Sequence, residues 1–301
     1  AERVVVEYVA FRFAGTLSFA ENLDTFAKNL QETQPTVFFA VPRIWTKFQM
    51  GILSKIPQEK LSKLLKIPVL SWVLKRKFKK ALGLSKARSI VSGAAPLQET
   101  QRTWFRKIGV SITNGYGMTE NCAITTHLGD GIIDKPGSVG LAQPGVELKI
   151  DSETSEILMR GPFMMKEYYK QPELTAEVIK ESWLHTGDQG HIDADGFLFI
   201  TGRVKDIFKT SKGKYIEPLV LEGYFGDILE FEQICVAGLG LPQPICLGVL
   251  SEIGLAKPKD ELQKYLSDYL EKVNEQLPGY KKISTLILVK DPWAVENGLM
   301  T

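Results

Sequence analysis

Ser89–Glu120 reads SIVSGAAPLQETQRTWFRKIGVSITNGYGMTE, a run in which β-type and helical patterns alternate. Ser89–Ser92 predicts a short strand, Gln98–Ile108 a helix and Val110–Thr113 a second strand. Strands that alternate with helices are typical of an α/β layer with a largely parallel sheet. We therefore expect an α/β fold built around this run.

Two short loops in the run follow directly after predicted strands. They are Ser92–Pro96 (SGAAP) and Gly115–Glu120 (GYGMTE). Binding sites of open α/β sheets lie beyond the carboxyl ends of the strands. Both loops are therefore candidate parts of a functional site.

Outward from this run, the chain divides into three blocks. Residues 1–135 continue the alternation and predict a partial α/β subdomain. Residues 136–202 combine frequent Gly and Pro with short strands and a hairpin signal at Asp195-Gly196, which predicts a small β-rich, barrel-like subdomain. Residues 203–301 predict a small α+β domain, with two apolar strands, a helix after Pro258 and a further strand.

The composition is balanced and argues against several classes of protein. Of 301 residues, 44% are hydrophobic and 24% are charged, with a formal net charge of +2. This balance, without a zinc-finger or RNP-type motif, gives no indication of nucleic-acid binding. The three cysteines lack C-x-x-C spacing, which argues against a zinc site or a disulfide framework. No run predicts a signal peptide or a membrane span, so we expect a cytoplasmic location.

Both ends of the chain look cut. The first residues, AERVVVEYVAFRF, contain no initiator Met and are already dense in apolar side chains. The last residues, ENGLMT, stop without a tail. We therefore expect the chain to be a piece of a longer protein.

Gly115–Glu120 carries residue types that suit a nucleotide and its metal ion. Two glycines around an aromatic permit a tight turn and a close approach of the backbone. Tyr116 could stack on a base, and the hydroxyl and backbone N–H of Thr119 suit a phosphate oxygen. Glu120 offers a hard oxygen ligand for Mg²⁺, which favours carboxylate together with phosphate. The alternative is an ordinary glycine-containing turn with a surface Glu.

Two further segments carry weaker signals. Ser92–Leu97 (SGAAPL) places small residues where a flat ring can lie against the backbone; the alternative is a tight loop with Pro at the start of a helix. Trp183–Gly190 (WLHTGDQG) places Asp188 after a Thr-Gly turn, where a carboxylate can bind both ribose hydroxyls; alternatively, Asp188 caps local backbone N–H groups. We expect His185 to pack or to hydrogen-bond rather than to catalyse, because no Ser or Cys nucleophile motif accompanies it.

Thr201–Pro218, TGRVKDIFKTSKGKYIEP, concentrates basic residues around two glycines. The basic side chains are those of Arg203, Lys205, Lys209, Lys212 and Lys214. Such side chains in a glycine-containing loop suit polyphosphate ligands; a solvated basic loop is the alternative. The order of all four segments in one chain is far more specific than any one of them.

This ordered set of motifs resembles the adenylate-forming superfamily of acyl-CoA synthetases, firefly-luciferase-like enzymes and peptide-synthetase adenylation domains. The closest resemblance is to long-chain fatty acid–CoA ligases, and it covers essentially the whole chain. Further segments that carry it are VPRIW (Val41–Trp45), GSVGLAQPGVELKI (Gly137–Ile150), EILMRGPFMMKEYYK (Glu156–Lys170) and the terminal ENGLMT. The resemblance implies the C-terminal part of a large AMP-binding domain followed by a small, mobile α+β domain.

The resemblance also implies a two-step reaction with ATP, Mg²⁺ and CoA. A fatty carboxylate attacks the α-phosphate of ATP to give acyl-AMP and pyrophosphate, and the CoA thiol then attacks the acyl carbon and releases AMP. Positioning and charge neutralisation at phosphorus are the physical basis of such catalysis. Two alternatives stay open: transfer of the acyl group to a carrier protein, and a non-catalytic nucleotide-binding fragment. The KTSKGKYIEP run favours CoA.

Residue roles carry over by position. The nucleotide-binding set implied by the resemblance comprises Gly93, Ala94, Ala95, Asn114, Gly115, Tyr116, Gly117, Thr119, Asp188, Ile200 and Arg203. Within it, Tyr116 corresponds to the aromatic against adenine, and Asp188 and Arg203 correspond to the pair that binds the ribose hydroxyls.

Catalysis and CoA binding involve a second set. The catalytic residues implied are Thr119 at the α-phosphate, Glu120 as Mg²⁺ ligand and Lys209 in the thioester-forming orientation. The residues implied at the CoA channel are Lys209, Lys212 and Gly213. Lys205 corresponds to the hinge between the two domains, and Trp45 resembles an aromatic gate of the fatty-acid tunnel.

Two features of the family are expected beyond the ends of this chain. The Ser/Thr/Gly-rich phosphate loop should lie upstream of residue 1, and a catalytic lysine should follow ENGLMT. Loss of one preorganised charge contact commonly costs about 10²–10³ in rate. We therefore expect the chain alone to form no detectable acyl-AMP, whereas the parent enzyme should be active.

Lys60–Lys80, KLSKLLKIPVLSWVLKRKFKK, is a further departure from the family pattern. It mixes leucines and a tryptophan with the basic run Lys75–Lys80. One hypothesis is an amphipathic helical pair that touches anionic lipid at the inner face of a membrane. The alternative is a surface helical insertion with a solvated basic face, since Pro68 interrupts the pattern.

Overall fold

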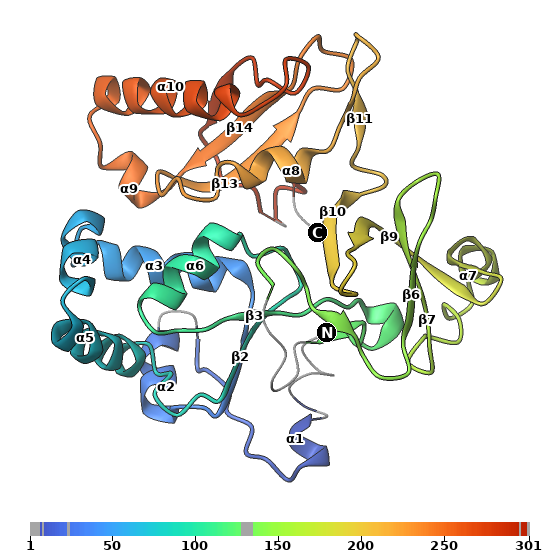
Figure 1. The fold of residues 1–301 in the computed structure, drawn as a ribbon, viewed down its shortest axis with the longest axis horizontal. Helices are drawn as coiled ribbons and strands as arrows, with labels where there is room; N and C mark the ends of the chain where they lie inside the picture. The colour runs from blue at the N-terminus through green and yellow to red at the C-terminus, as the bar shows by residue number, and fades with distance from the viewer. Residues whose placement is uncertain (1–6, 8, 23–24, 128–134, 295, 300–301) are drawn as a thin grey trace. The chain divides into compact units, whose positions relative to one another are not determined.

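The computed structural model describes residues 7, 9–22, 25–127, 135–294 and 296–299, and the chain forms two compact units (Figure 1). Unit 1 comprises Ala1–Thr186 and His191–Ile200, and unit 2 comprises Gly187–Gly190 and Thr201–Thr301. The expected boundary at residue 135, within unit 1, stays a prediction.

A parallel sheet of three strands organises the first half of unit 1. Its strands, in the order β1-β2-β3, are β1 (Val37–Ala40), β2 (Ser89–Ser92) and β3 (Thr113–Asn114). Both pairs are parallel, with Val37 opposite Ser89 and Val91 opposite Thr113. The predicted parallel sheet is therefore confirmed. Where a strand was expected at Val110–Thr113, the structure has the two-residue strand β3 at Thr113–Asn114. Val110 and Ile112 are buried by packing and are not paired in the ladder.

Helices accompany this sheet, as the α/β pattern predicts. The helices of unit 1 are α1 (Val9–Arg12), α2 (Phe26–Thr33), α3 (Pro42–Leu53), α4 (Gln58–Leu65), α5 (Pro68–Ala81), α6 (Glu99–Lys107), the 3₁₀-helix η2 (Thr119–Asn121) and α7 (Pro172–Val178). Proline stands at the start of α3, α5 and α7, where its missing N–H costs nothing. Pro68 therefore begins a second helix instead of ending the amphipathic pattern.

The second half of unit 1 is rich in strands. They are β4 (Thr126–His127), β5 (Leu141–Ala142), β6 (Glu147–Ile150), β7 (Glu156–Arg160), β8 (Ile179–Lys180), β9 (Trp183–Ile192) and β10 (Leu198–Arg203), the last two reaching into unit 2. The main sheet has the order β10-β9-β7-β6, with β8 on β9. β6 and β7, and likewise β8 and β9, are antiparallel. The β-rich character of this block is confirmed.

The turn expected at Thr186-Gly187, within WLHTGDQG, was wrong. Trp183–Ile192 is one ten-residue strand, in which Leu184, Thr186 and Asp188 are buried at alternate positions. Two of these three buried side chains are polar, so the period of two does not appear as alternating hydrophobicity. Gly187 has φ +73, which gives the strand a local irregularity.

Unit 2 is a compact α+β unit with its own core. Its further elements are β11 (Phe208–Lys209), β12 (Tyr215–Ile216), α8 (Pro218–Gly223), β13 (Phe231–Ala237), β14 (Ile245–Leu250), α9 (Glu252–Leu255), α10 (Lys259–Glu275) and β15 (Leu286–Val289). β14 pairs antiparallel with β13 and parallel with β15. α10 buries Leu262, Leu266 and Val273 in this core. Among the described helices, none combines the length and apolar character that crossing a membrane requires.

Candidate active site

The carboxyl ends of β2 and β3 bring two predicted site loops together. Ser92 lies opposite Asn114, and the Gly115 N–H donates to the Ser92 carbonyl over 2.9 Å. A Cβ added to Gly93 would lie 3.3 Å from the Gly115 carbonyl oxygen. The SGAAP and GYGMTE segments are thus neighbours because parallel strands end at the same edge.

The first of these loops presents small, exposed side chains on a strained backbone. Ala94 and Ala95 are exposed, and Ala94 has φ +65. An L-residue in this left-handed region costs roughly 1–2 kcal/mol. Strain of this kind concentrates at ligand-binding sites. The loop is therefore suited to a flat group lying against its backbone.

Unpaired polar atoms mark the same strand ends. Within the described residues, Ser92 Oγ and Asn114 Oδ1 are buried and have no hydrogen-bond partner. Leaving such a group unpaired costs about 1–3 kcal/mol, so native proteins rarely retain one without a function. These two atoms could therefore hydrogen-bond a polar ligand at the carboxyl ends of β2 and β3.

The GYGMTE loop closes tightly on itself. A Cβ on Gly117 would stand 2.4 Å from the Ala123 carbonyl carbon, so only glycine fits. Fully buried Asn121 accepts a hydrogen bond from the Met118 N–H (3.0 Å) and donates to Thr125 Oγ1 (2.6 Å). The close backbone approach expected from the glycines is therefore confirmed at Gly117.

Thr119 and Glu120 begin the 3₁₀-helix that follows this loop. The Thr119 side chain is exposed, while Glu120 is half-buried. Tyr168 Oη donates to Glu120 Oε1 over 2.7 Å, and the Met165 N–H donates to the Glu120 carbonyl over 2.6 Å. The hydrogen bond from Tyr168 therefore orients the Glu120 carboxylate.

Tyr168 is a site residue that the sequence interpretation missed. Burial, together with the hydrogen bond to Glu120, raises the pKa of Tyr168 to about 12. In the sequence, Tyr168 was marked only by its position in the EYYK segment, which resembles the family but implied no role for this residue. The phenol therefore stays protonated and donates to Glu120 throughout the neutral range.

The residues present are compatible with Mg²⁺ only if the nucleotide supplies further ligands. Within the described part of the chain, no group of three His, Cys, Asp or Glu residues could hold a metal ion. Mg²⁺ commonly binds proteins through one or two carboxylates plus substrate phosphates. Glu120 fits that pattern as a single hard oxygen ligand.

Tyr116 and Ile200 meet in the core instead of lining an open surface. Tyr116 is buried with Ile157 and Leu198, and Ile200 packs against the same cluster. The two predicted nucleotide contacts are therefore brought together. Stacking of Tyr116 on a base stays a prediction, since nearly all of its side chain is covered by protein.

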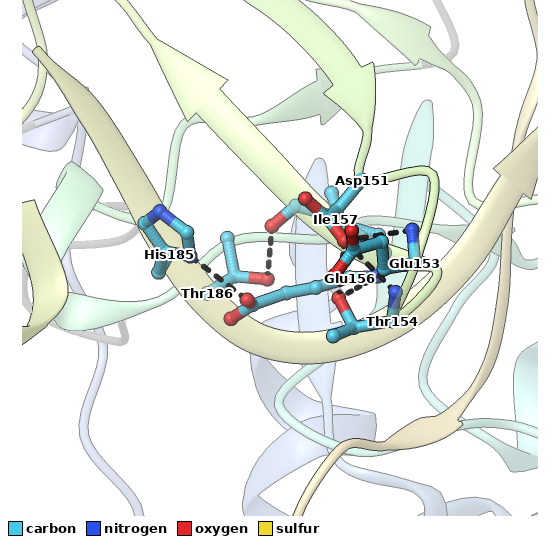
Figure 2. A network of polar contacts seen from close by, with 7 residues as sticks. All are labelled: Asp151, Glu153, Thr154, Glu156, Ile157, His185 and Thr186. Carbon is cyan, nitrogen blue, oxygen red and sulfur yellow. Dashed lines mark hydrogen bonds and ion pairs between the residues drawn. The ribbon is translucent and has the colours of Figure 1, made fainter. Parts of the chain in front are cut away.

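A polar network fixes the β6–β7 turn and the start of β9 (Figure 2). His185 Nδ1 lies 2.8 Å from Glu156 Oε2, and Thr186 Oγ1 donates to the Ile157 carbonyl over 2.7 Å. The expectation that His185 hydrogen-bonds is thus confirmed. Asp151 Oδ1 accepts from the Thr154 N–H (2.8 Å), and this bond is the largest cause of its lowered pKa.

In unit 2, the predicted ribose pair is in contact. Arg203 Nε lies 3.2 Å from Asp188 Oδ1. The Asp188 side chain is largely buried, whereas that of Arg203 is mostly exposed. The arrangement places a largely buried carboxylate beside an exposed guanidinium, and a carboxylate can accept hydrogen bonds from two vicinal hydroxyls.

The remaining basic site residues of unit 2 lie on one exposed hairpin and the turn before it. Lys205 is exposed in the turn after β10. Lys209 pairs with Tyr215 in the β11–β12 hairpin, with Nζ 5.3 Å from the tyrosine ring centroid. Lys212 and Gly213, which has φ +76, form the hairpin tip.

Trp45 belongs to an aromatic core cluster. Its side chain is 0% exposed and makes edge contacts with Phe38, Phe48 and Phe105 at 5.3–5.9 Å between ring centroids. Its buried indole N–H has no hydrogen-bond partner among the described residues. The gate role stays a prediction, and it requires this cluster to open.

Comparison with known proteins gives consistent relatives. Long chain acyl-CoA synthetase 2 of Arabidopsis thaliana is 29% identical over 327 residues, covering 91% of this chain and 49% of that protein. Fatty acyl-CoA synthetase B of Dictyostelium discoideum is 30% identical over 271 residues, covering 79% of this chain and 40% of that protein. The chain thus spans less than half the length of these two relatives.

Solved structures support the same assignment. The A-PCP didomain of carboxylic acid reductase from Segniliparus rugosus, in complex with AMP, matches with a TM-score of 0.72 and 26% identity, over 94% of this chain and 41% of that chain. This match confirms the expected α/β fold of adenylate-forming domains. The family model described as AMP-binding enzyme matches residues 1–169, more than half of the chain. The chain therefore belongs to the AMP-binding enzyme family.

Proposed function

We propose that the protein carrying this chain activates a long-chain fatty acid with ATP and transfers the acyl group to CoA. In the first step, a carboxylate oxygen attacks the α-phosphorus and pyrophosphate leaves, giving acyl-AMP. In the second step, the CoA sulfur loses its proton and attacks the acyl carbon, and AMP leaves. The name of the Arabidopsis relative supports the long-chain substrate class, and that of the Dictyostelium relative supports a fatty acyl substrate.

The observation that carries the proposal is the fixed carboxylate of Glu120. Tyr168 Oη donates to Glu120 Oε1, and the exposed Thr119 immediately precedes Glu120 in the chain. Preorganised polar groups of this kind stabilise charge that develops on a transferring phosphoryl group. Glu120 would hold Mg²⁺, which neutralises phosphate charge when bound, and Thr119 would contact the α-phosphate.

Three other places in the fold have matching chemistry. In unit 1, the exposed Ala94–Ala95 backbone suits the flat face of adenine. In unit 2, the Asp188 carboxylate suits the ribose hydroxyls, and the exposed lysines of the β11–β12 hairpin suit the phosphates of CoA. The small-domain rotation expected from the family is part of this proposal.

A carrier protein that bears a thiol is the second candidate acceptor. The exposed cations Lys209, Lys212 and Lys214 would attract an acidic protein surface as well as the phosphates of CoA. A third candidate is a chain that binds nucleotide without turnover, which the unpaired polar atoms of Ser92 and Asn114 would equally support.

The first test measures nucleotide binding to this chain by calorimetry. We expect AMP to bind, and Mg²⁺ to tighten the binding of ATP. Glu120→Gln should abolish the effect of Mg²⁺ and leave AMP affinity unchanged, whereas the exposed Glu153→Gln should change neither. An equal Mg²⁺ effect in wild type and Glu120→Gln would remove Glu120 from the proposed site.

The second test measures turnover in protein that carries this chain. The proposal predicts that AMP is released from ATP only when palmitate and CoA are both present, because CoA takes the acyl group from acyl-AMP. AMP release that depends on a carrier protein instead would support the second candidate. Nucleotide binding without any AMP release would leave only the nucleotide-binding role.

A further inference from the structure

Helices α4 and α5 lie side by side in unit 1 (Figure 1) and pack together. Their sequence is strongly basic. Gln58–Ala81 holds eight Lys or Arg residues and a single carboxylate, Glu59. The exposed cations of this segment are Lys60, Lys63, Lys66, Arg76, Lys77 and Lys80. Within the described residues, no ion pair involves any of the eight. The positive charge is therefore not neutralised by the surrounding protein.

Apolar side chains are exposed on the same surface. Ile67 is 53% exposed, Val69 76% and Trp72 57%. Val69, Trp72, Arg76 and Lys80 follow one another at intervals of three or four residues and so share a face of α5. The buried Ser71 and Phe78 occupy the opposite face. The outward face of α5 thus begins apolar and ends basic.

Trp72 and Arg76 form a single amphipathic group on this face. The Arg76 guanidinium carbon lies 3.9 Å from the Trp72 ring centroid, a close cation–π contact. The contact holds an indole and a charge side by side at the surface. Indole rings and the stems of long basic side chains are suited to the boundary between headgroups and hydrocarbon.

We propose that this α4–α5 surface docks on an anionic lipid bilayer. Such a bilayer offers negative headgroups for the cations and, a few ångström deeper, hydrocarbon for Ile67, Val69 and Trp72. An acidic protein partner would satisfy the cations but would also need an apolar pocket matched to these three side chains. The adjacency of apolar and basic groups on one convex helix face therefore favours lipid. The proposal is independent of the reaction proposed above.

The test is vesicle binding by the intact chain. Vesicles of phosphatidylcholine are compared with vesicles of phosphatidylcholine and phosphatidylglycerol in equal parts, and co-sedimentation is measured at low and raised salt. We expect binding only to the anionic vesicles, weakened by salt because screening shortens the reach of surface charge. Absence of binding to anionic vesicles, or equal binding to neutral ones, would overturn the proposal.

Two triple variants with the same change of net charge locate the surface. Arg76→Gln/Lys77→Gln/Lys80→Gln should weaken partition to anionic vesicles on the order of 100-fold, since each cation near such a surface contributes severalfold. Lys259→Gln/Lys264→Gln/Lys272→Gln, on the exposed side of α10, should stay close to wild type. Equal losses in the two variants would show a non-specific charge effect and refute the docking surface. Thermal melting followed by circular dichroism establishes that both variants fold.

Trp72→Ala separates the apolar contribution from the charge. It should weaken binding to anionic vesicles severalfold while keeping the salt dependence. An unchanged affinity would contradict insertion of this face. Polyglutamate serves as a competitor: if it displaces the chain from vesicles at a charge ratio near one, an acidic protein is the better partner and the lipid proposal fails.

Discussion

The Gly115–Ala123 loop of unit 1 and the Lys209–Tyr215 hairpin of unit 2 both carry predicted ligand contacts, but they differ in how firmly the surrounding protein holds them. The loop is held from inside by the buried Asn121 and from outside by the bond of Tyr168 to Glu120. The hairpin has a two-residue ladder, and its lysines are exposed.

Under the proposed function, this difference would correspond to two ways of handling phosphate charge. A carboxylate that must hold a metal ion gains from a fixed position, because reorganisation during reaction is costly. Lysine side chains act as point charges on flexible stems and can follow a ligand that arrives in more than one orientation. We therefore expect substitutions to be costly in the loop and cheap in the hairpin.

The largest effect is expected for Gly117→Ala. The new Cβ would lie 2.4–2.6 Å from three backbone atoms of Ala123, so the loop must open. We expect a loss of roughly 3 kcal/mol of unfolding free energy, at the upper end of overpacking costs. Urea unfolding followed by circular dichroism measures the loss, and hydrogen exchange of the loop amides locates it.

Gly115→Ala is the matched control in the same loop. A Cβ there would meet only Val91 Cγ1, at 3.6 Å, an ordinary contact. Its stability should stay within about 1 kcal/mol of wild type. If the two alanine variants lose the same stability, close packing at Gly117 is not what shapes the loop.

The next largest effect is expected for Asn121→Ala. The change leaves the Met118 N–H and the Thr125 hydroxyl without their partner, at a cost of about 2 kcal/mol. Thr210→Ala is the counterpart in the hairpin, where Thr210 Oγ1 accepts from the Lys214 N–H over 3.2 Å, and it should cost about 1 kcal/mol. Urea unfolding measures the loss of unfolding free energy in both variants. A larger loss in Thr210→Ala than in Asn121→Ala would contradict the expected order of loop and hairpin.

Much of the fold was predictable because its patterns are local. Ser89–Ser92 is a strand over the residues expected, and the helix expected at Gln98–Ile108 is present as Glu99–Lys107. Apolar periodicity and turn residues suffice for such elements. The strand Trp183–Ile192 was not predicted over its full length, and a turn was expected at Thr186-Gly187, because its buried positions hold Thr186 and Asp188, whose polarity hides the strand period.

The site was predictable only in part, for a related reason. Motif residues such as Glu120 can be recognised one at a time, but their supports come from distant segments. Tyr168 lies 48 residues from Glu120, and no sequence period links them. Likewise, the burial of Tyr116 and Trp45 depends on long-range packing, which residue type alone does not reveal.

A smaller effect with a distinct pH signature is expected for Tyr168→Phe. Losing the hydrogen bond to Glu120 should cost about 1 kcal/mol at neutral pH. Because the folded-state pKa of Tyr168 is raised from 10.0 to about 12, its contribution is fully present below pH 10 and is lost as the pH rises towards 12. Stability of the wild type should therefore fall over this window, and titration of tyrosinate absorbance should lose one late step in the variant.

The neighbouring Tyr169→Phe controls for loss of a phenol. Tyr169 is exposed, so its removal should leave stability unchanged. Tyr265 and Tyr269 of unit 2 also have pKa values raised to about 12, chiefly by burial, so some late titration remains in either variant. An identical late titration in the wild type and in Tyr168→Phe, or an equal loss of stability in the two phenylalanine variants, would contradict the assigned hydrogen bond.

The smallest effect is expected in the hairpin, for Lys214→Gln. Its Nζ lies 5.8 Å from the Tyr280 ring centroid and is exposed, so the contact is at the weak limit of cation–π attraction. The loss should be below about 0.5 kcal/mol. Lys281→Gln is the comparison, because Lys281 Nζ contacts Glu217 Oε2 at 2.7 Å in a partly buried pair whose removal should cost about 1 kcal/mol. If urea unfolding ranks the two lysines in the opposite order, the hairpin is held by its charges, and the contrast with the loop of unit 1 does not stand.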